Sequence, residues 1–339
     1  MTPFSPRPFQ PRRLLSNAHL QTIFGNILPR TNTLPPETAE LVEVSPATQY
    51  QIASQVLCHC HWHPAPVRAA RLTVILLHGL EGSSRSQYVV GNANKMWQAG
   101  FNVVRMNMRN CGGTEALSPT LYHSGLSSDV DTVMRSLTHR FGLEQVALVG
   151  YSMGGNLVLK LAGELADASP VNLRAVVGVS PAVDLGDSAD ALHLPVNRLY
   201  ERRFLRALLK RFRRKVALFP RVYDPAHAHG IRSLRDFDER ITALYNGFAG
   251  ASDYYHRAAA ARVVDRITVP TLILHALDDP FVHLTPSTRA MLRLNPAITL
   301  IEPAHGGHCA FLATPNRGAS DDGYWAEATL LQFLRENSW

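Results

Sequence analysis

Cysteine is scarce in this sequence, and the few residues present are scattered. The chain has 339 residues and four cysteines, Cys58, Cys60, Cys111 and Cys309. Secreted domains that depend on disulfides carry more cysteines at closer spacing. We therefore expect no disulfide framework, a reducing compartment, and Cys111 and Cys309 as unreactive packing residues.

Long apolar runs are also missing. A membrane-spanning helix needs about 18 or more apolar residues in succession, and the longest run, around Leu72–Leu77, falls far short. Near the start, Arg12 and Arg13 precede two leucines, but Ser16 and Asn17 interrupt any signal-peptide core. Hydrophobic and charged contents of 46% and 18% are those of an ordinary soluble globular protein. A cytoplasmic location is the expectation.

The excess of basic over acidic residues is confined to one segment. The whole chain has a formal net charge of +7, and nine basic residues lie between Arg198 and Lys215 against one acid, Glu201. This segment therefore carries +8, and the rest of the chain carries −1. No nucleic-acid-binding motif accompanies it, so we expect no nucleic-acid partner.

Apolar segments of strand length alternate with helical patterns over most of the chain. Strands are predicted at 72–77, 101–106, 146–150, 175–179, 271–277 and 298–301. Helices are predicted at 93–99, 127–140, 286–292, 324–334 and directly after residue 156. This alternation predicts an α/β fold with a mostly parallel central sheet and helices on both faces. A short helix at 17–27 and an antiparallel strand pair, 39–44 and 51–62, are predicted ahead of it.

Residues 184–262 interrupt the alternation and are helical, polar and basic. Because strands and helices alternate again beyond them, we interpret this stretch as a helical lid inserted above the sheet. The predicted organisation is one domain over 1–339. It consists of an N-terminal extension with edge strands (1–71), a core in two parts (72–183 and 263–339), and the lid insertion (184–262).

The stretch Val146-Ala147-Leu148-Val149-Gly150-Tyr151-Ser152-Met153-Gly154-Gly155 joins a predicted strand to a predicted helix. This Gly-x-Ser-x-Gly pattern at a strand-to-helix turn is that of a nucleophile elbow. The glycines leave room for a sharp turn that holds Ser152 in a strained, exposed position. The helix that follows directs its N-terminal N–H groups at the serine, where a negative oxygen would develop. Ser152 is the predicted nucleophile.

Active sites of parallel α/β sheets lie at the carboxyl ends of the strands. Asp278 and Asp279 follow one predicted strand, and His305 and His308 follow the next. A serine becomes a good nucleophile when a histidine takes its proton, and a carboxylate orients that histidine. We favour Asp279 as the acid and His308 as the base. Asp278 and His305 are the competing candidates, but Asp278 is more typical of a turn-forming residue and His305 of a solvated turn residue.

Several motifs together resemble one family, the AB hydrolase 4 (YheT-like) branch of the α/β-hydrolases. They are Asn17-Ala18-His19-Leu20-Gln21-Thr22, Leu77-His78-Gly79-Leu80-Glu81-Gly82-Ser83-Ser84, Tyr122-His123-Ser124-Gly125 with Asp129, the elbow, Asp253-Tyr254-Tyr255, Asp278-Asp279-Pro280 and Gly306-Gly307-His308. The resemblance implies the α/β-hydrolase fold and hydrolysis of carboxylic esters, usually acyl-chain and lipid esters. Some relatives instead transfer the acyl group to an alcohol. His308 stands at the family's histidine position.

An oxyanion hole needs two backbone donors, so side chains give little guidance. One is the N–H of Met153, directly after the nucleophile. The other should come from the loop after 72–77, where the resemblance indicates Leu80. His78 is interpreted as a structural hydrogen-bonding residue beneath that loop.

The stretch Cys58-His59-Cys60-His61-Trp62-His63 invites a metal-site interpretation. Side chains alternate faces along a strand, so the two cysteines would point one way and the three histidines the other. A tetrahedral site needs ligands that converge from more than one segment. We favour an edge strand with assorted side chains, and expect neither a metal nor a cofactor.

The basic segment has two interpretations. Leu205, Leu208, Leu209, Phe212 and Val216 lie at helical spacing, with arginines on the other face. The basic face could simply be solvated, or the helix could lie on an anionic membrane and admit acyl chains, which requires its apolar stripe to face outward as well.

The sequence therefore predicts a cofactor-free carboxylesterase or lipase-like serine hydrolase that forms an acyl-enzyme on Ser152. An alcohol O-acyltransferase with the same triad and a catalytically silent binding protein on the same scaffold are the alternatives.

Overall fold

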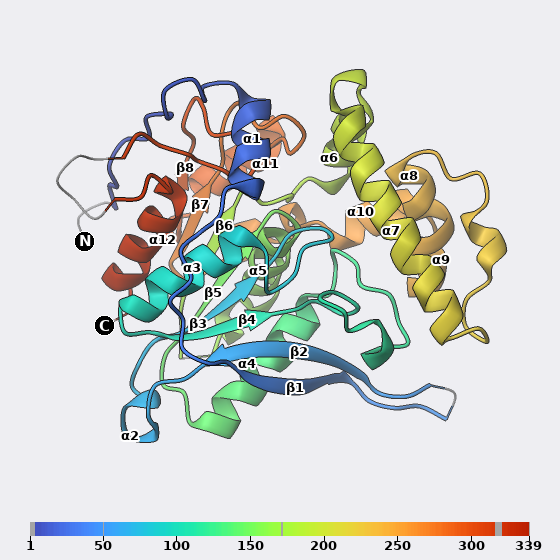
Figure 1. The fold of residues 1–339 in the computed structure, drawn as a ribbon, viewed down its shortest axis with the longest axis horizontal. Helices are drawn as coiled ribbons and strands as arrows, with labels where there is room; N and C mark the ends of the chain where they lie inside the picture. The colour runs from blue at the N-terminus through green and yellow to red at the C-terminus, as the bar shows by residue number, and fades with distance from the viewer. Residues whose placement is uncertain (1–3, 50, 171, 316–320, 339) are drawn as a thin grey trace.

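The computed structural model describes residues 4–49, 51–170, 172–315 and 321–338. Its centre is an eight-stranded sheet with the strand order β1-β2-β4-β3-β5-β6-β7-β8 (Figure 1). The strands are β1 (Thr38–Ser45), β2 (Ser54–His61), β3 (Thr73–Leu77), β4 (Asn102–Met106), β5 (Val146–Tyr151), β6 (Leu173–Val179), β7 (Thr271–Leu274) and β8 (Ile298–Ile301). Strands β3 to β8 all run parallel, while β1 and β2 form an antiparallel pair at one edge, with β2 antiparallel to β4. The predicted sheet and its antiparallel edge are confirmed.

Helices cover both faces of this sheet (Figure 1). The core helices are α3 (Gln87–Gln98), α4 (Ser127–Phe141), α5 (Met153–Leu165), α11 (Pro286–Leu294) and α12 (Trp325–Glu336), with α1 (Ala18–Ile27) and the short α2 (Ala65–Arg68) ahead of them. Apolar residues of α3 and α12 pack with one face of the sheet, and those of α4, α5 and α11 pack with the other. Helices on both faces of a mostly parallel sheet are therefore observed, as the sequence predicts.

The central strands are apolar throughout because both of their faces are covered. All five residues of β3 are buried. Ile75 and Leu77 belong to the core on the α4–α5 side, while Val74 and Leu76 belong to the core on the α3–α12 side. Such a strand has no polar face, so its sequence shows a continuous apolar run.

Several predicted boundaries differ from the structure by a few residues; the strand predicted at 51–62, for example, is β2 at Ser54–His61. Two of the differences have a clear physical reason. Helix α3 begins at Gln87 rather than at residue 93, because its first turns bury polar residues through hydrogen bonds. Asn92, for example, is fully buried and donates to the Tyr151 hydroxyl at 2.7 Å. Strand β7 ends at Leu274 rather than at residue 277, because the chain turns out of the sheet and leaves Leu277 exposed.

The stretch between β6 and β7 is helical, as predicted, and lies beside the sheet on the right of Figure 1. It contains α6 (Leu185–His193), α7 (Arg198–Leu218), α8 (Leu234–Phe237), a π-helical turn (Asp238–Ala243), α9 (Leu244–Asn246) and α10 (Ala251–Ala258). Short 3₁₀ turns join them at Pro195–Asn197, Pro225–Ala228, Ala260–Arg262 and Val264–Arg266, and two further 3₁₀ turns lie in the core at Glu115–Leu117 and Ala166–Ala168. Of the helices described, none combines the length and apolar character that crossing a bilayer requires.

Candidate active site

Ser152 lies at the junction of β5 and α5 in a strained backbone conformation. Its φ and ψ are 54° and −117°, a region that residues with a side chain rarely adopt. A Cβ atom on Gly150 would lie 2.1 Å from the Gly154 carbonyl oxygen, and one on Gly154 would lie 2.5 Å from the His78 carbonyl oxygen. Only glycine fits either position, so the turn that presents Ser152 depends on both flanking residues.

The structure brings Ser152, His308 and Asp279 into one hydrogen-bonded chain. The Ser152 hydroxyl oxygen is 2.9 Å from His308 Nε2, and His308 Nδ1 is 2.7 Å from Asp279 Oδ2. A carboxylate accepts only, so Nδ1 carries the proton and Nε2 is free to accept from the serine. This is the tautomer in which a histidine can act as a general base toward a serine.

Burial and charge act against each other on the His308–Asp279 pair. Burial alone would raise the pKa of Asp279, but the facing imidazole and its hydrogen bond outweigh that effect and hold the pKa below its ordinary value. Burial would likewise lower the pKa of His308, yet the Asp279 carboxylate raises it. The pair therefore favours an imidazolium next to a carboxylate, the charge state that proton transfer from Ser152 creates.

The two competing residues lie next to the triad without joining it. Asp278 accepts a hydrogen bond from the Gly307 N–H at 2.9 Å and contacts the ring of the exposed His305 at 3.3 Å. Asp278 therefore shapes the loop that carries His308, which is the turn-forming role considered for it from the sequence.

Two backbone N–H groups border Ser152 where an oxyanion hole would form. Met153 begins α5, and Leu80 follows Gly79, on which a Cβ atom would lie 3.1 Å from the Ser152 Cβ. In the described part of the chain, neither the Met153 nor the Leu80 N–H donates to another protein group. Met153 and Leu80 therefore stay the candidates for the two oxyanion-hole donors.

His78 supports the Leu80 loop from below. Its Nδ1 is 2.8 Å from the Gly79 carbonyl oxygen, and its Nε2 accepts the Met108 N–H at 3.2 Å. Burial lowers the pKa of His78 to about 4, so the ring is neutral and uses one nitrogen as donor and the other as acceptor. The structural role predicted for His78 is confirmed.

A largely apolar cavity of about 120 Å³ adjoins Ser152. The core contributes Leu80, Met153 and Phe281, and the insertion contributes residues from α6, α7, α8 and α10. Two charged residues also line it. Arg211 is bonded to Glu81 at 2.8 and 3.1 Å, while Asp238 accepts hydrogen bonds from Thr242 and Tyr255. Sequence reasoning missed these lining residues, because no local pattern shows which insertion side chains face the serine.

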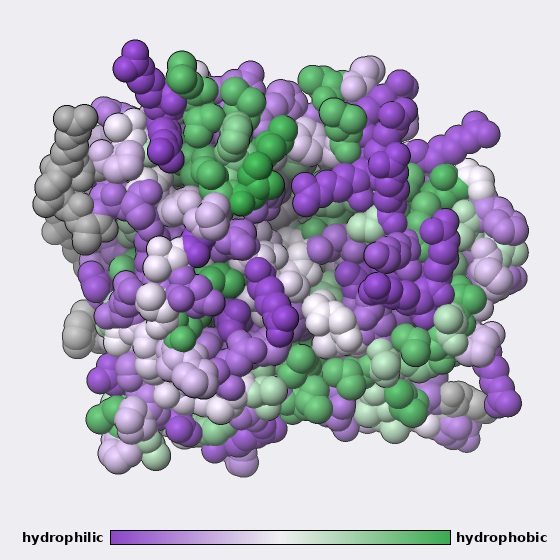
Figure 2. Space-filling model, viewed as in Figure 1, coloured by the Kyte–Doolittle hydropathy of each residue, from purple (hydrophilic) through white to green (hydrophobic). Residues whose placement is uncertain are grey.

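Helix α7 turns its apolar stripe toward the protein. Leu205, Leu208 and Phe212 are buried, and Leu208 and Phe212 line the cavity. The membrane interpretation of the sequence required this stripe to face outward, and that expectation is wrong. The opposite face carries exposed basic residues, Arg198, Arg202, Arg203, Arg206, Lys210, Arg213 and Arg214. Hydrophilic side chains crowd this side of the molecule (Figure 2).

The cysteine- and histidine-rich strand β2 places its side chains on opposite faces, as expected for an edge-strand segment. Cys58 and Cys60 lie in the core beside α4, and burial raises the pKa of the Cys58 thiol to about 12. On the other face, His59 contacts Glu37 at 2.8 Å and His61 contacts Arg105 at 3.1 Å. No group of three or more potential metal ligands occurs among the described residues.

Cys309 packs against the core on the α3–α12 side, as expected, and it also lies next to the site. Its Sγ is 3.5 Å from His308 Nε2, and its backbone has a left-handed φ of 61°. Cys111, in contrast, is fully buried in the core.

Comparisons with known proteins show which sequences and folds this chain is similar to. A family model described as alpha/beta hydrolase fold matches residues 73–315. The chain is 33% identical to the Escherichia coli (strain K12) protein named "Putative esterase YheT", over 90% of this chain and 87% of that protein. It is 28% identical to the Homo sapiens protein named "Phospholipase ABHD3", over 72% of this chain and only 59% of that relative.

One solved structure has a fold similar to that of this chain. The Pyrococcus furiosus esterase Pf2001 superposes with a TM-score of 0.53 over 92% of this chain and 99% of that chain, at 14% identity. At that identity the likeness concerns the fold alone.

Proposed function

The chain belongs to the alpha/beta hydrolase fold family, and from this premise we propose that it is a serine hydrolase that cleaves carboxylic esters with Ser152, His308 and Asp279. The observation that carries the proposal is the continuous chain of hydrogen bonds from Asp279 through His308 to Ser152. The names of the E. coli and human relatives support the same reaction class.

In the first half of the reaction, Ser152 Oγ attacks the ester carbonyl carbon while His308 Nε2 takes its proton. The negative charge on the former carbonyl oxygen is stabilised by the N–H groups of Met153 and Leu80. Asp279 stabilises the imidazolium and holds the ring in place. His308 then donates its proton to the alcohol oxygen, and the C–O bond breaks to leave an acyl group on Ser152.

In the second half, water attacks the acyl-enzyme and gives its proton to His308. The second tetrahedral intermediate collapses, the acid leaves, and the proton returns to Ser152. An alcohol in place of water would give a new ester through the same steps, so the balance between hydrolysis and acyl transfer depends on which nucleophile reaches the acyl-enzyme.

We propose acyl-chain or lipid esters as substrates. The cavity beside Ser152 is lined mostly by apolar side chains, which suits a hydrocarbon chain rather than a charged one. The human relative named as a phospholipase supports a lipid substrate. The helices between β6 and β7 form much of the cavity wall, and we propose that they act as its lid.

For the basic face of α7, we propose peripheral contact with an anionic membrane. Since the apolar stripe is buried, this contact would use the exposed basic residues of α7 with Leu194, Val196 and Leu199, which are exposed at its N-terminal end. Basic residues close to an anionic surface each contribute about 1 kcal/mol of attraction. Such a contact would bring lipid esters close to the cavity.

A fluorophosphonate probe tests the proposed function. It should label the wild-type protein and lose labelling and ester turnover in Ser152→Ala. Unchanged hydrolysis of p-nitrophenyl acetate by the alanine variant would contradict the proposal.

A further inference from the structure

Helix α1 packs on the protein with an unusual orientation. Its buried residues are Gln21, Thr22 and Gly25, while Leu20, Ile23 and Ile27 are exposed. In Figure 2, hydrophobic side chains gather at the surface near this helix, at the top of the view. A helix held by the hydrophobic effect would show the opposite arrangement. Specific polar contacts must therefore account for the way α1 docks.

These polar contacts are made with the loop that carries His308. The Thr22 hydroxyl accepts the His308 N–H at 2.9 Å and donates to the Ala18 carbonyl oxygen at 2.8 Å. The Gln21 side chain, fully buried, accepts the Leu312 N–H at 2.8 Å and donates to the Leu312 carbonyl oxygen at 3.0 Å. Two consecutive residues of α1 thus bond to both ends of the segment 308–312.

The loop has little regular structure of its own. Gly307, Cys309 and Phe311 all have left-handed φ values, 57°, 61° and 45°. A Cβ atom on Gly307 would lie 2.5 Å from the Ala18 carbonyl oxygen, so the backbones of α1 and the loop meet directly. Because no helix or strand fixes the backbone of His308, its position depends on the groups that bond to this loop.

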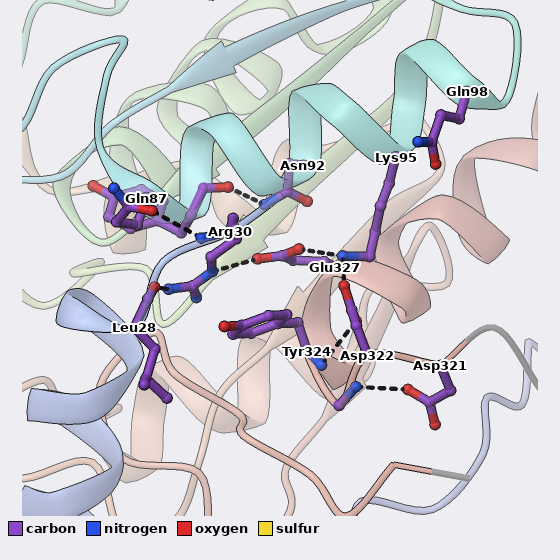
Figure 3. A network of polar contacts seen from close by, with 12 residues as sticks. Leu28, Arg30, Gln87, Asn92, Lys95, Gln98, Asp321, Asp322, Tyr324 and Glu327 are labelled. Carbon is purple, nitrogen blue, oxygen red and sulfur yellow. Dashed lines mark hydrogen bonds and ion pairs between the residues drawn. The ribbon is translucent and has the colours of Figure 1, made fainter. Parts of the chain in front are cut away.

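The far end of α1 is held by a buried ion-pair network (Figure 3). Arg30 donates to the carbonyl oxygens of Gly25 and Leu28 at the end of α1, and its Nε lies 3.2 Å from Glu327 of α12. Glu327 also pairs with Lys95 of α3 at 2.6 Å, and the side chains of Arg30 and Glu327 are almost fully buried. The network connects α1 to two core helices, which makes α1 a fixed support.

We infer that Thr22, supported by Gln21 and the Arg30–Glu327–Lys95 network, is a positioning residue for His308. The inference rests on the proposed function, because it concerns how well His308 reaches Ser152. It assigns a role in catalysis to a segment that lies outside residues 73–315, where the family model matches. Asp279 fixes the imidazole ring, and Thr22 fixes the backbone from which that ring projects.

The test compares Thr22→Val with Thr22→Ser. Valine keeps the shape but leaves the His308 N–H without an acceptor, so kcat for p-nitrophenyl acetate should fall about tenfold or more while KM stays near the wild-type value. Labelling of Ser152 by the fluorophosphonate should slow by the same factor. Weaker contact with Asp279 should also shift the rise of kcat/KM with pH to lower pH, since the carboxylate raises the pKa of His308. Serine restores the acceptor, so Thr22→Ser should restore kcat, the labelling rate and the pH profile.

Thr33→Val is the matched control. Thr33 belongs to the same N-terminal extension, but its hydroxyl bonds to Asn94 of α3 at 2.9 Å and not to the His308 loop. This variant should lose thermal stability without a change in kcat or pH profile. If Thr22→Val does not fold, Thr22→Ala takes its place against Thr22→Ser. The inference would be overturned by equal kcat values in the valine (or alanine) and serine variants of Thr22. It would also be overturned if Thr22→Val and Thr33→Val lost kcat to the same extent. Failure of the proposed function would instead appear as absent labelling in the wild type.

Discussion

Replacing Asp279 with asparagine should reverse the proton arrangement on His308. Asp279 Oδ1 accepts the N–H groups of Phe281 and Val282 at 3.2 and 2.9 Å, and Oδ2 faces His308 Nδ1 at 2.7 Å. The carbonyl oxygen of an asparagine would keep the two backbone bonds, so its NH₂ group would face Nδ1. That ring nitrogen would then have to accept, the proton would lie on Nε2, and His308 could no longer take the proton of Ser152.

The expected loss in kcat is about 10⁴-fold, as in other triads whose aspartate becomes asparagine, which corresponds to about 5 kcal/mol in the activation free energy. The variant should fold normally, because the buried hydrogen bonds to Phe281 and Val282 remain. The pH profile gives a second readout. Hydrolysis requires neutral His308, so kcat/KM rises as pH passes the pKa of His308, and Asp279 raises that pKa. Without the carboxylate, the residual activity should begin to rise at lower pH.

The assay is kcat and kcat/KM for p-nitrophenyl acetate between pH 5 and 9, with Asp278→Asn as the matched control. Asp278 bonds only to the loop at Gly307 and His305 among its described contacts, so its variant should lose far less activity. If Asp278→Asn were the more damaging change, or if Asp279→Asn kept activity within tenfold of the wild type, the assignment of the acid would be wrong.

Three further changes probe the elbow, the cavity and the basic face. Gly154→Ala places a Cβ atom 2.5 Å from the His78 carbonyl oxygen and should lower Tm and abolish turnover, at a cost of about 1–3 kcal/mol or more. A Cβ atom on Gly186 of α6 would lie 3.9 Å from the Tyr255 ring, an ordinary contact distance, so Gly186→Ala should leave Tm and turnover intact. Equal Tm values for the two variants would contradict this. Asp238→Leu removes the carboxylate, which is bonded to Thr242 and Tyr255, and makes the cavity wall more apolar. The ratio of kcat/KM for p-nitrophenyl octanoate over acetate should therefore rise severalfold, because apolar surface buried against a hydrocarbon chain contributes about 25 cal/mol per Å². An unchanged ratio would place the carboxylate away from the acyl chain. Changing Arg202, Arg206, Lys210 and Arg213 together to glutamine should weaken binding to phosphatidylglycerol vesicles and reduce the salt dependence of that binding, because salt screens such charges beyond about 10 Å at 0.1 M. Hydrolysis of p-nitrophenyl acetate should stay near normal. Equal, salt-insensitive partition of the wild type into neutral and anionic vesicles would mean that the basic face of α7 is merely solvated.

The fold and the three central residues could be predicted because their signals are local. Ser152 directly follows β5, and Asp279 and His308 lie in the loops that follow β7 and β8. The carboxyl ends of such parallel strands meet at one edge of the sheet. Gly150 and Gly154 add a turn that few other functions require. The cavity wall could not be predicted, because which face of a helix turns inward is decided by its partners in three dimensions.

Helices α7 and α1 show this limit in opposite ways. The amphipathic pattern of α7 correctly predicted a helix with an apolar stripe, but the stripe faces the cavity instead of a membrane. In α1, the motif containing Gln21 and Thr22 was part of the family resemblance, yet nothing in the local pattern indicated contact with His308, 286 residues away along the chain. Long-range hydrogen bonds between side chain and backbone leave no periodic signal in the sequence.

The most direct test of the account is to trap the acyl-enzyme. Rapid acid quenching during turnover of a slowly deacylated p-nitrophenyl ester, followed by mass spectrometry of the digested protein, should show the acyl mass on the peptide that contains Ser152. The adduct should be absent from Ser152→Ala. An acyl group on any other residue, or steady turnover by the wild type with no acylated peptide at any quench time, would contradict a covalent mechanism at Ser152.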